Sequence, residues 1–301
     1  MIDLNYNHLW YFWNVAETGG VSAAARELGV APATVSASVR GLERALGSEL
    51  LERQGRDLVL TDLGDRVRVR ARDIFSAGRD LLEDVRSESG RPARVTVGVS
   101  EALPKLVARE FLRATLQSPT TGTLRVRETN ADVLIGELAA HRLDLVITDE
   151  PVRIPPGSQL TIVPLGVSPV GFFASPTLAK SLREEFPRSI AGAPALLPGP
   201  FTALRRSLDR WFATHNLHPE IVAEFDDPAL SKVFAREGSG FVALPQVVSE
   251  EVIEENGFEL CGVPEGCVET FYAVTSPRRS RRPEVDAVIE EAKEILAAAK
   301  G

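Results

Sequence analysis

The prolines of this chain are distributed so unevenly that they divide it into two parts. Only Pro32, of 20 prolines, lies within the first 90 residues, where apolar residues recur at helical spacing between short glycine-containing turns. After that point proline and glycine are frequent, and strand-like runs alternate with helical ones. A chain of 301 residues usually holds two or three cores. We therefore expect a helical N-terminal domain followed by a larger α/β part.

Residues 32–46 form the most informative helix of the first part. Pro32 suits a helix start, because its missing N–H would be unpaired there in any case. An apolar stripe follows at i, i+4, i+7 and i+11 and consists of Val35, Val39, Leu42 and Leu46. The opposite face and its flanks are small, hydroxylated and cationic, and they carry Ala33, Thr34, Ser36, Ala37, Arg40 and Arg44.

A shorter helix, residues 23–28, is expected before it, with Ser22 as its capping residue and Gly29 as its end. Two short helices joined by a tight turn are typical of a helix-turn-helix, whose second helix enters the major groove of DNA. Small side chains allow close approach, and hydroxyls and Arg40 reach bases or phosphates. The alternative is a plain three-helix bundle with a solvated face. The net charge of −8 excludes a protein that is basic throughout, but it does not bear on a local cationic face.

Strand-like runs at residues 50–53 and 57–60 predict a β-hairpin wing around Gln54-Gly55-Arg56. The wing places two arginines near backbone phosphates, a contact that weakens as salt increases. The predicted DNA-binding residues are therefore Ser22, Ala33, Thr34, Ser36, Ala37, Arg40, Arg44, Arg53 and Arg56.

Residues 63–90 predict a long helix with a heptad seam. Apolar and small residues follow 4-3-4-3-4 spacing, which is typical of a two-helix interface, and they are Val67, Ala71, Ile74, Gly78, Leu81 and Val85. The functional interpretation is a dimerising linker helix. The alternative is an amphipathic helix that packs on its own domain.

An ordered series of short motifs in this region resembles the LysR-type transcriptional regulators. The motifs cover residues 22–28, 31–36, 39–43, 46–47, 51–53 with Arg56, and 60–64. Ala31-Pro-Ala-Thr34 stands where most members begin the recognition helix with Ser-Gln-Pro-Ala, so the base preference of the family is not carried over.

A closer resemblance is to members of the family that activate sodium/proton antiporter genes. It is carried by residues 4–13, 97–103, 142–149 and 224–230. The resemblance implies a ligand-responsive regulator in the cytoplasm, a homodimer or homotetramer, that activates antiporter or cation-stress genes. Its implied partners are double-stranded promoter DNA, a small effector (an ion or a small molecule), a second copy of the chain and RNA polymerase. The alternative is a regulator of an unrelated metabolic or redox regulon.

The resemblance also implies the fold class, an α+β multidomain chain. A winged helix-turn-helix (residues 1–62) and a linker helix (63–90) precede a two-lobed α/β effector domain (91–301) like the periplasmic binding proteins. Lobe I is expected at about 91–164 and 268–301, and lobe II at about 165–267. The alternation of strands and helices after residue 92 agrees with this, because it indicates mostly parallel sheets covered by helices.

Ligands in open α/β sheets bind beyond the carboxyl ends of the strands. Residues at such positions here are the predicted effector-binding residues, namely Ser100, Glu101, Thr129, Asn130, Asp149, Phe201, Thr202 and Asp226. One hypothesis for the ligand is a small anion at the helix start capped by Thr202, with Arg205 and Arg206 one turn later. The other is a hard cation, which prefers oxygen ligands such as Asp149, Asp226 and Asp227.

Other classes of protein find less support in the sequence. We find no P-loop, no Gly-x-Ser-x-Gly and no metal-ligand cluster, so we expect no enzyme, no cofactor and no metal. A two-lobed enzyme or solute-binding protein with a helical appendage is the alternative, and the absence of an export or membrane-spanning segment opposes the second of these. Cys261 and Cys267 are too few for a disulfide framework, and they are either a redox switch or buried apolar residues.

Overall fold

In the computed structural model, the helices of the N-terminal part begin and end at residues suited to capping. Helix α1 (Tyr6–Thr18) begins after Asn5, whose side chain accepts hydrogen bonds from the N–H groups of Asn7 and His8. Helices α2 (Val21–Leu28) and α3 (Pro32–Leu46) end at Gly29 and Gly47, both with left-handed φ. Helix α2 is preceded by Gly20 and not capped by Ser22, so that capping prediction was wrong.

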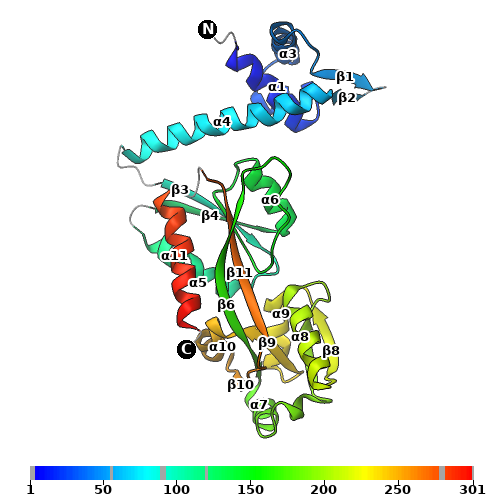
Figure 1. Cartoon of the computed structure of the whole chain (residues 1–301), viewed down its shortest axis with the longest axis vertical. Coiled ribbons are helices and arrows are strands. Elements are labelled where there is room, and N and C mark those ends of the chain that lie inside the picture. Colours follow the sequence, from blue (N-terminus) through cyan, green and yellow to red (C-terminus); the bar gives the residue numbers. More distant parts are fainter. Residues whose placement is uncertain (1–3, 55–56, 89–92, 119–120, 278–281, 300–301) are drawn as a thin grey trace. The chain divides into compact units, whose positions relative to one another are not determined.

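The structure describes residues 4–54, 57–88, 93–118, 121–277 and 282–299. The chain forms two units, residues 1–91 and 92–301, each with its own core (Figure 1). The N-terminal unit is a winged helix-turn-helix followed by one long helix, α4 (Asp62–Glu88), and the second unit is a two-lobed α/β domain. The predicted fold class is confirmed.

The core of the N-terminal unit joins the three short helices. Phe12, Val35, Val39 and Leu42 are all nearly fully buried in it. Leu46, the last member of the predicted apolar stripe, is 42% exposed, because α3 ends at the next residue and no element covers it. The stripe therefore supplies three core residues instead of four.

The wing is held against α3 by one carboxylate. Oε1 of Glu43 accepts hydrogen bonds from the N–H groups of Leu50 and Leu51 at 2.9 and 3.2 Å. The chain then forms strand β1 (Leu51–Gln54), which pairs antiparallel with β2 (Asp57–Leu60). The predicted hairpin is confirmed, and the recognition helix and the wing are fixed relative to each other within this unit.

The predicted seam of α4 divides into two halves. Ala71 is fully buried in the core of its own unit, and Val67 and Ile74 pack against the same core. The short helices of this chain therefore cover Ala71, whereas Val67 and Ile74 are only partly buried. Leu81 and Val85 are 62% and 56% exposed, and Gly78 is also exposed.

Within its described residues, the second unit contains nine strands with helices between them. The strands are β3 (Ala93–Ser100), β4 (Thr121–Thr129), β5 (Leu145–Thr148), β6 (Thr161–Ala174), β7 (Pro194–Pro198), β8 (Glu220–Phe225), β9 (Phe241–Pro245), β10 (Glu259–Gly262) and β11 (Val268–Thr275). The helices are α5 (Lys105–Gln117), α6 (Ala131–Ala139), α7 (Pro176–Arg183), α8 (Ala203–His215), α9 (Pro228–Arg236), α10 (Ser249–Asn256) and α11 (Pro283–Ala298), with the 3-10 turns η1 (Arg188–Ile190) and η2 (Gln246–Val248).

The strand order is β4-β3-β5-β11-β6-β9-β7-β8, and β10 also pairs with β6. The outer pairs are parallel, as expected, but β6 and β11 run antiparallel to each other and to their neighbours. Figure 1 shows these two strands side by side from one lobe to the other. Residues 161–164 and 170–174 were predicted as separate strands, but they belong to one strand of 14 residues because β11 pairs with it across the crossing.

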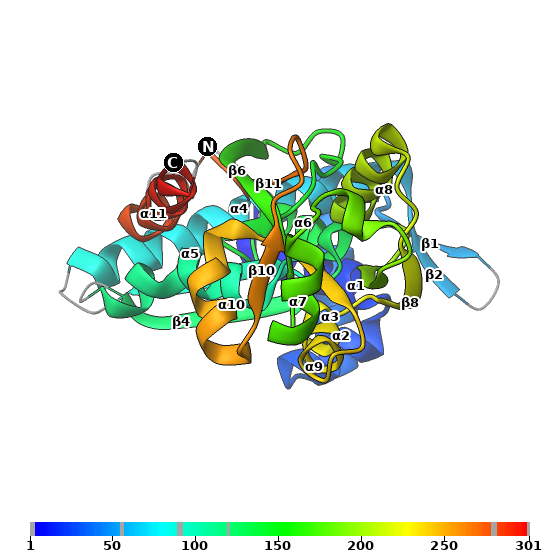
Figure 2. The ribbon, with the colours of Figure 1, turned by 90° about the horizontal axis from the view of Figure 1, so that it is seen from below.

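One apolar core continues from the first lobe into the second. Phe111 of α5 and Phe271 of β11 share it with Leu196 of β7 and Leu244 of β9. Three elements of this region were not predicted, namely α7, α10 and β10. Figure 2 shows β10 beside α7, where β10 pairs with β6.

Candidate nucleic-acid interface and ligand cavity

The solvent-facing side of α3 carries the residues expected to meet DNA. Ala33, Thr34, Ala37, Arg40 and Arg44 are all exposed, and Ser36 is half-buried at the edge of the same face. The buried face holds Val35, Ser38, Val39 and Leu42 instead. Helical periodicity thus separates one surface for the core from one for a partner, as the sequence predicts.

The arginines of this surface are available to a partner at their guanidinium ends. Arg44 donates from Nε to the carbonyl oxygen of Arg40 at 3.3 Å, one turn earlier in the helix. Arg53 is exposed on β1, and Ser22 is exposed on α2. Arg56 lies outside the described residues.

A close approach of α4 to the wing completes this unit. Thr61 donates its N–H to the carbonyl oxygen of Leu50, and its hydroxyl accepts the N–H of Gly64 at 2.9 Å. A β-carbon at Gly64 would lie 2.0 Å from that same Leu50 oxygen. Glycine is therefore required at the first turn of α4 for the helix to reach the wing.

In the second unit, a cavity of about 30 Å³ lies between the two lobes. Its lining from the first lobe includes Ala102, Pro104 and Asp149, and its lining from the second lobe includes Thr202 and Asp226. The remaining walls are mostly apolar and consist of Leu196, Leu197, Pro198, Leu204, Phe225, Pro228, Ser231, Val242, Ala243, Leu244 and Glu269.

Asp149 is the most buried of the predicted effector-binding carboxylates. It follows β5 and is only 4% exposed, and its Oδ1 has no hydrogen-bond partner in the described part of the chain. Burial raises the pKa of Asp149 above its ordinary value, and the charge of Glu150 adds to this. Arg206 and a hydrogen bond from Ser100 act in the opposite direction.

Glu269 on β11 is a second buried carboxylate in the same cavity, and the sequence analysis missed it. It is 3% exposed, and its Oε2 has no hydrogen-bond partner among the residues described. Burial, with a contribution from the charge of Asp149, raises the pKa of Glu269 to about 8. The signal was an acidic residue within the strand-like run from Val268 to Thr275, which reads as an ordinary alternation.

Other predicted effector-binding residues lie away from the cavity lining. Glu101 and Asn130 are exposed, and the Asn130 side chain caps α6 by accepting the N–H of Asp132. Thr129 contributes its carbonyl oxygen to the Glu101 N–H, and Phe201 is 89% exposed. For these four positions the strand-end rule identified the last residue of a strand, loop residues and a helix cap, none of which lines the cavity.

The expected anion site is already filled by side chains of the protein. The Thr202 hydroxyl caps α8 by accepting the Arg205 N–H. The Arg205 guanidinium donates to Asp209 and Glu224, and Arg206 pairs with Glu150 of the first lobe at 2.8 Å. Both arginines are thus engaged by carboxylates.

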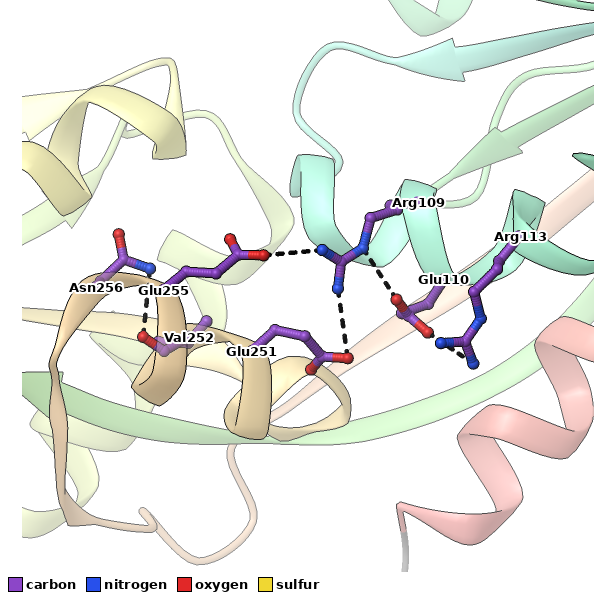
Figure 3. Close-up of polar contacts among 7 residues, drawn as sticks. All are labelled: Arg109, Glu110, Arg113, Glu251, Val252, Glu255 and Asn256. Atoms are coloured by element: carbon purple, nitrogen blue, oxygen red, sulfur yellow. Dashed lines mark hydrogen bonds and ion pairs between the residues drawn. The ribbon is translucent and has the colours of Figure 1, made fainter.

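A second cross-link joins α5 to α10, as Figure 3 shows. Arg109 of α5 contacts Glu255 at 2.9 Å and Glu251 at 3.4 Å on α10, and it also contacts Glu110 at 3.0 Å. Arg113 pairs with the other oxygen of Glu110. Arg109 is about half exposed, so each pair contributes little stability alone, although the network holds the two helices in one relative position.

The cysteines are buried and separate. Burial raises the pKa of the Cys261 thiol to about 12 and raises that of Cys267 as well. Because the thiolate is the reactive form, both groups are poorly reactive at neutral pH. This environment favours the interpretation of both cysteines as buried apolar residues.

The described residues offer no group of three or more His, Cys, Asp or Glu side chains that could hold a metal ion. Asp227, one of the three carboxylates considered for a hard cation, instead caps α9 by accepting the N–H of Ala229. Among the helices described, none is both long enough and apolar enough to cross a membrane.

Two family models match almost the whole chain. Residues 6–65 match the bacterial regulatory helix-turn-helix protein, lysR family, and residues 88–297 match the LysR substrate binding domain. The chain is 30% identical over 288 residues to the transcriptional activator protein NhaR of Escherichia coli (strain K12). This match covers 96% of this chain and 95% of NhaR. It is 35% identical over 159 residues to the small neutral protease regulatory protein of Streptomyces coelicolor, about half of each chain.

Solved structures share the fold. ArgP from Mycobacterium tuberculosis has a TM-score of 0.66 at 18% identity and covers 98% of both chains. Full-length CbnR in complex with its target DNA has a TM-score of 0.54 at 21% identity, with 96% of this chain and all of CbnR covered. With its exposed recognition helix, its wing and its two-lobed second unit, this chain belongs to the LysR family and is a DNA-binding transcriptional regulator.

Proposed function

We propose that α3 reads promoter DNA in the major groove while arginines of α3 and the wing contact the backbone. The observation that carries this assignment is the exposed face of small, hydroxyl and arginine side chains opposite the buried stripe. Ala33, Ala37 and Thr34 allow close approach, and Arg40 lies one turn further along the helix. Arg44, Arg53, Arg56 and Ser22 are assigned to phosphates.

Replacing Arg40 with alanine is expected to weaken binding to the cognate promoter by roughly 5- to 150-fold, because a bidentate arginine–base contact contributes about 1–3 kcal/mol. Replacing Arg53 with alanine is expected to weaken all DNA alike and to reduce the salt slope by about 1. Gel-shift titrations at several salt concentrations measure both effects. Arg210→Ala, an exposed arginine on α8, is the matched control. Unchanged binding in both variants would contradict the assignment.

The exposed end of α4 is proposed as the dimer contact. Leu81, Leu82 and Val85 are 62%, 59% and 56% exposed on one helix, and a second copy of the helix would cover them. Ala71, which is buried in its own unit, is no longer assigned to the contact. The interface therefore begins near Gly78, where the absence of a side chain allows close helix approach.

The double variant Leu81→Asp with Val85→Asp is expected to raise the dimer dissociation constant by roughly 100-fold or more, because two apolar contacts per chain become charged. Sedimentation equilibrium measures the change. Ile253→Asp, at an aliphatic residue on α10 that is 41% exposed, serves as the control. A double variant that remains dimeric at the same concentration would place the interface elsewhere.

The cavity between the lobes is the proposed effector site, with Asp149, Thr202 and Asp226 in its lining and Ser100 behind Asp149. The protein is proposed to act in the cytoplasm. There it activates sodium/proton antiporter or cation-stress genes and recruits RNA polymerase to their promoters. The support is the 30% identity to the activator NhaR along nearly the full chain. Capture of bound promoters followed by sequencing tests this, and peaks far from any cation-transport gene would instead favour an unrelated regulon.

A further inference from the structure

Two buried carboxylates, each with one oxygen that makes no hydrogen bond among the described residues, belong to the lining of the cavity between the lobes. Asp149 ends β5 of the first lobe, and Glu269 lies on β11, which crosses between the lobes. Both side chains are at least 96% buried, and Asp149 Oδ1 and Glu269 Oε2 make no hydrogen bond within the described chain. They come from different elements, so the cavity brings them together.

Buried carboxylate oxygens without hydrogen-bond partners are costly in the ionised form, and two carboxylates in one small cavity repel each other. The charge of Arg206 favours ionised Asp149, but burial outweighs it and the pKa of Asp149 is raised on balance. Arg205 is engaged by Asp209 and Glu224, and Arg206 is engaged by Glu150. Asp226 at the rim adds a further acid. The site therefore has an excess of negative charge, which a bound cation or a proton must balance.

The residues that line the cavity limit which kind of cation can bind there. Ca²⁺ and Mg²⁺ take six or more oxygen ligands, whereas the described residues offer no group of three or more His, Cys, Asp or Glu side chains that could hold a metal ion. Beside the two carboxylates the lining is largely aliphatic and aromatic, with Leu196, Leu244 and Phe225 among it. An ammonium group has N–H donors for two carboxylates, and an attached carbon chain fits apolar walls.

We propose that this cavity binds a small alkylammonium cation, with the ammonium group between Asp149 and Glu269 and the carbon chain against the apolar wall. The inference rests on the effector role proposed above and names the chemical class of the effector. The cavity of about 30 Å³ limits the ligand to a few carbon atoms unless the lobes separate. The cation contacts Asp149 from the first lobe and the second-lobe wall at once, so it favours the closed arrangement.

A proton competes with this cation. The pKa of Glu269, raised to about 8 by burial and by Asp149, keeps that carboxyl protonated in the empty site at neutral pH. Asp149 is the charged group that acts on Glu269, Glu150 and Arg206 act in turn on Asp149, and Asp226 lines the same cavity. An alkylammonium group titrates near the lysine value of about 10.4 and keeps its protons. Binding therefore releases one proton from Glu269 to solvent, and affinity rises with pH until about 8.

The test uses the full chain without DNA, at pH 8.5 and constant ionic strength in choline chloride. Methylammonium, ethylammonium or sodium chloride replaces part of the choline, and the unfolding midpoint Tm of the second unit is measured. The alkylammonium ions are expected to raise Tm by roughly 3 to 5 °C at about ten times their Kd, and the rise is smaller at pH 6. Sodium is expected to raise it less. An equal rise with sodium, or no rise with any cation, overturns the proposal.

Glu269→Gln and Asp149→Asn keep the shape of the site and remove one charge each. Both are expected to lose the alkylammonium-dependent rise, whereas Glu265→Gln, an exposed carboxylate close by in the chain, retains it. A rise retained in Glu269→Gln would place the site elsewhere. Should either variant unfold, proton release by the wild type, measured calorimetrically in buffers of different ionisation heat, decides the question. Because no DNA is present, failure here is separate from failure of promoter binding.

Discussion

Glu269→Gln is expected to abolish most of the loss of stability that the second unit undergoes as the pH rises from about 4.5 to 8. The folded protein holds a proton on Glu269 up to about pH 8, whereas the unfolded chain releases it near 4.5. Between these values the folded state binds more protons, so stability falls with rising pH by about 1.4 kcal/mol per unit. The stabilisation by the Glu269 proton is fully present below pH 4.5 and is lost above about pH 8. The total is on the order of 5 kcal/mol.

Scanning calorimetry of the second transition between pH 5 and 9, in choline buffers without small cations, measures this slope. Glutamine cannot ionise, so the variant is expected to show a flatter profile and to exceed the wild type in Tm at pH 9. Glu265→Gln is the control, because that carboxylate is exposed. A variant as steep as the wild type would show that Glu269 is not the group that titrates.

Gly64→Ala is expected to destabilise the N-terminal unit by roughly 3 kcal/mol, and DNA binding is lost with the fold. The added β-carbon would lie 2.0 Å from the Leu50 carbonyl oxygen, which is backbone and accepts the Thr61 N–H. To avoid this clash, α4 would have to move away from the wing. Urea unfolding of the full chain, followed by far-UV circular dichroism, measures the loss.

Gly78→Ala is the matched control in the same helix. No atom lies within 4 Å of a β-carbon placed there. Alanine favours the helix over glycine by about 1 kcal/mol, so at concentrations where the chain is monomeric this variant is expected to be slightly more stable than the wild type. If Gly64→Ala behaved like Gly78→Ala, the close approach of α4 to Leu50 would be wrong.

The sequence predicted burial best where the buried and exposed faces depend on the periodicity of a single helix. The face of α3 follows from helical periodicity alone, so Val35, Val39 and Leu42 were identified as core and Arg40 as surface. Leu46 was misassigned because the end of a helix, and not its period, exposes that position.

The sequence was least informative where distant elements meet. Ala71 looks like a seam residue until the short helices cover it, and β6 looks like two strands until β11 pairs along it. Glu269 is one acid in an ordinary strand, and only the fold places it beside Asp149. Phe201 and Asn130 satisfied the strand-end rule, but that rule locates an edge of the sheet and not the side chains that enter a cavity.

The paired strands β6 and β11 determine how the second unit can move. They are hydrogen-bonded to each other along the passage between lobes, so they behave as one ribbon and not as two independent tethers. A ribbon resists stretching and sliding but yields to bending and twisting. The two lobes can therefore change their relative angle by bending of this strand pair.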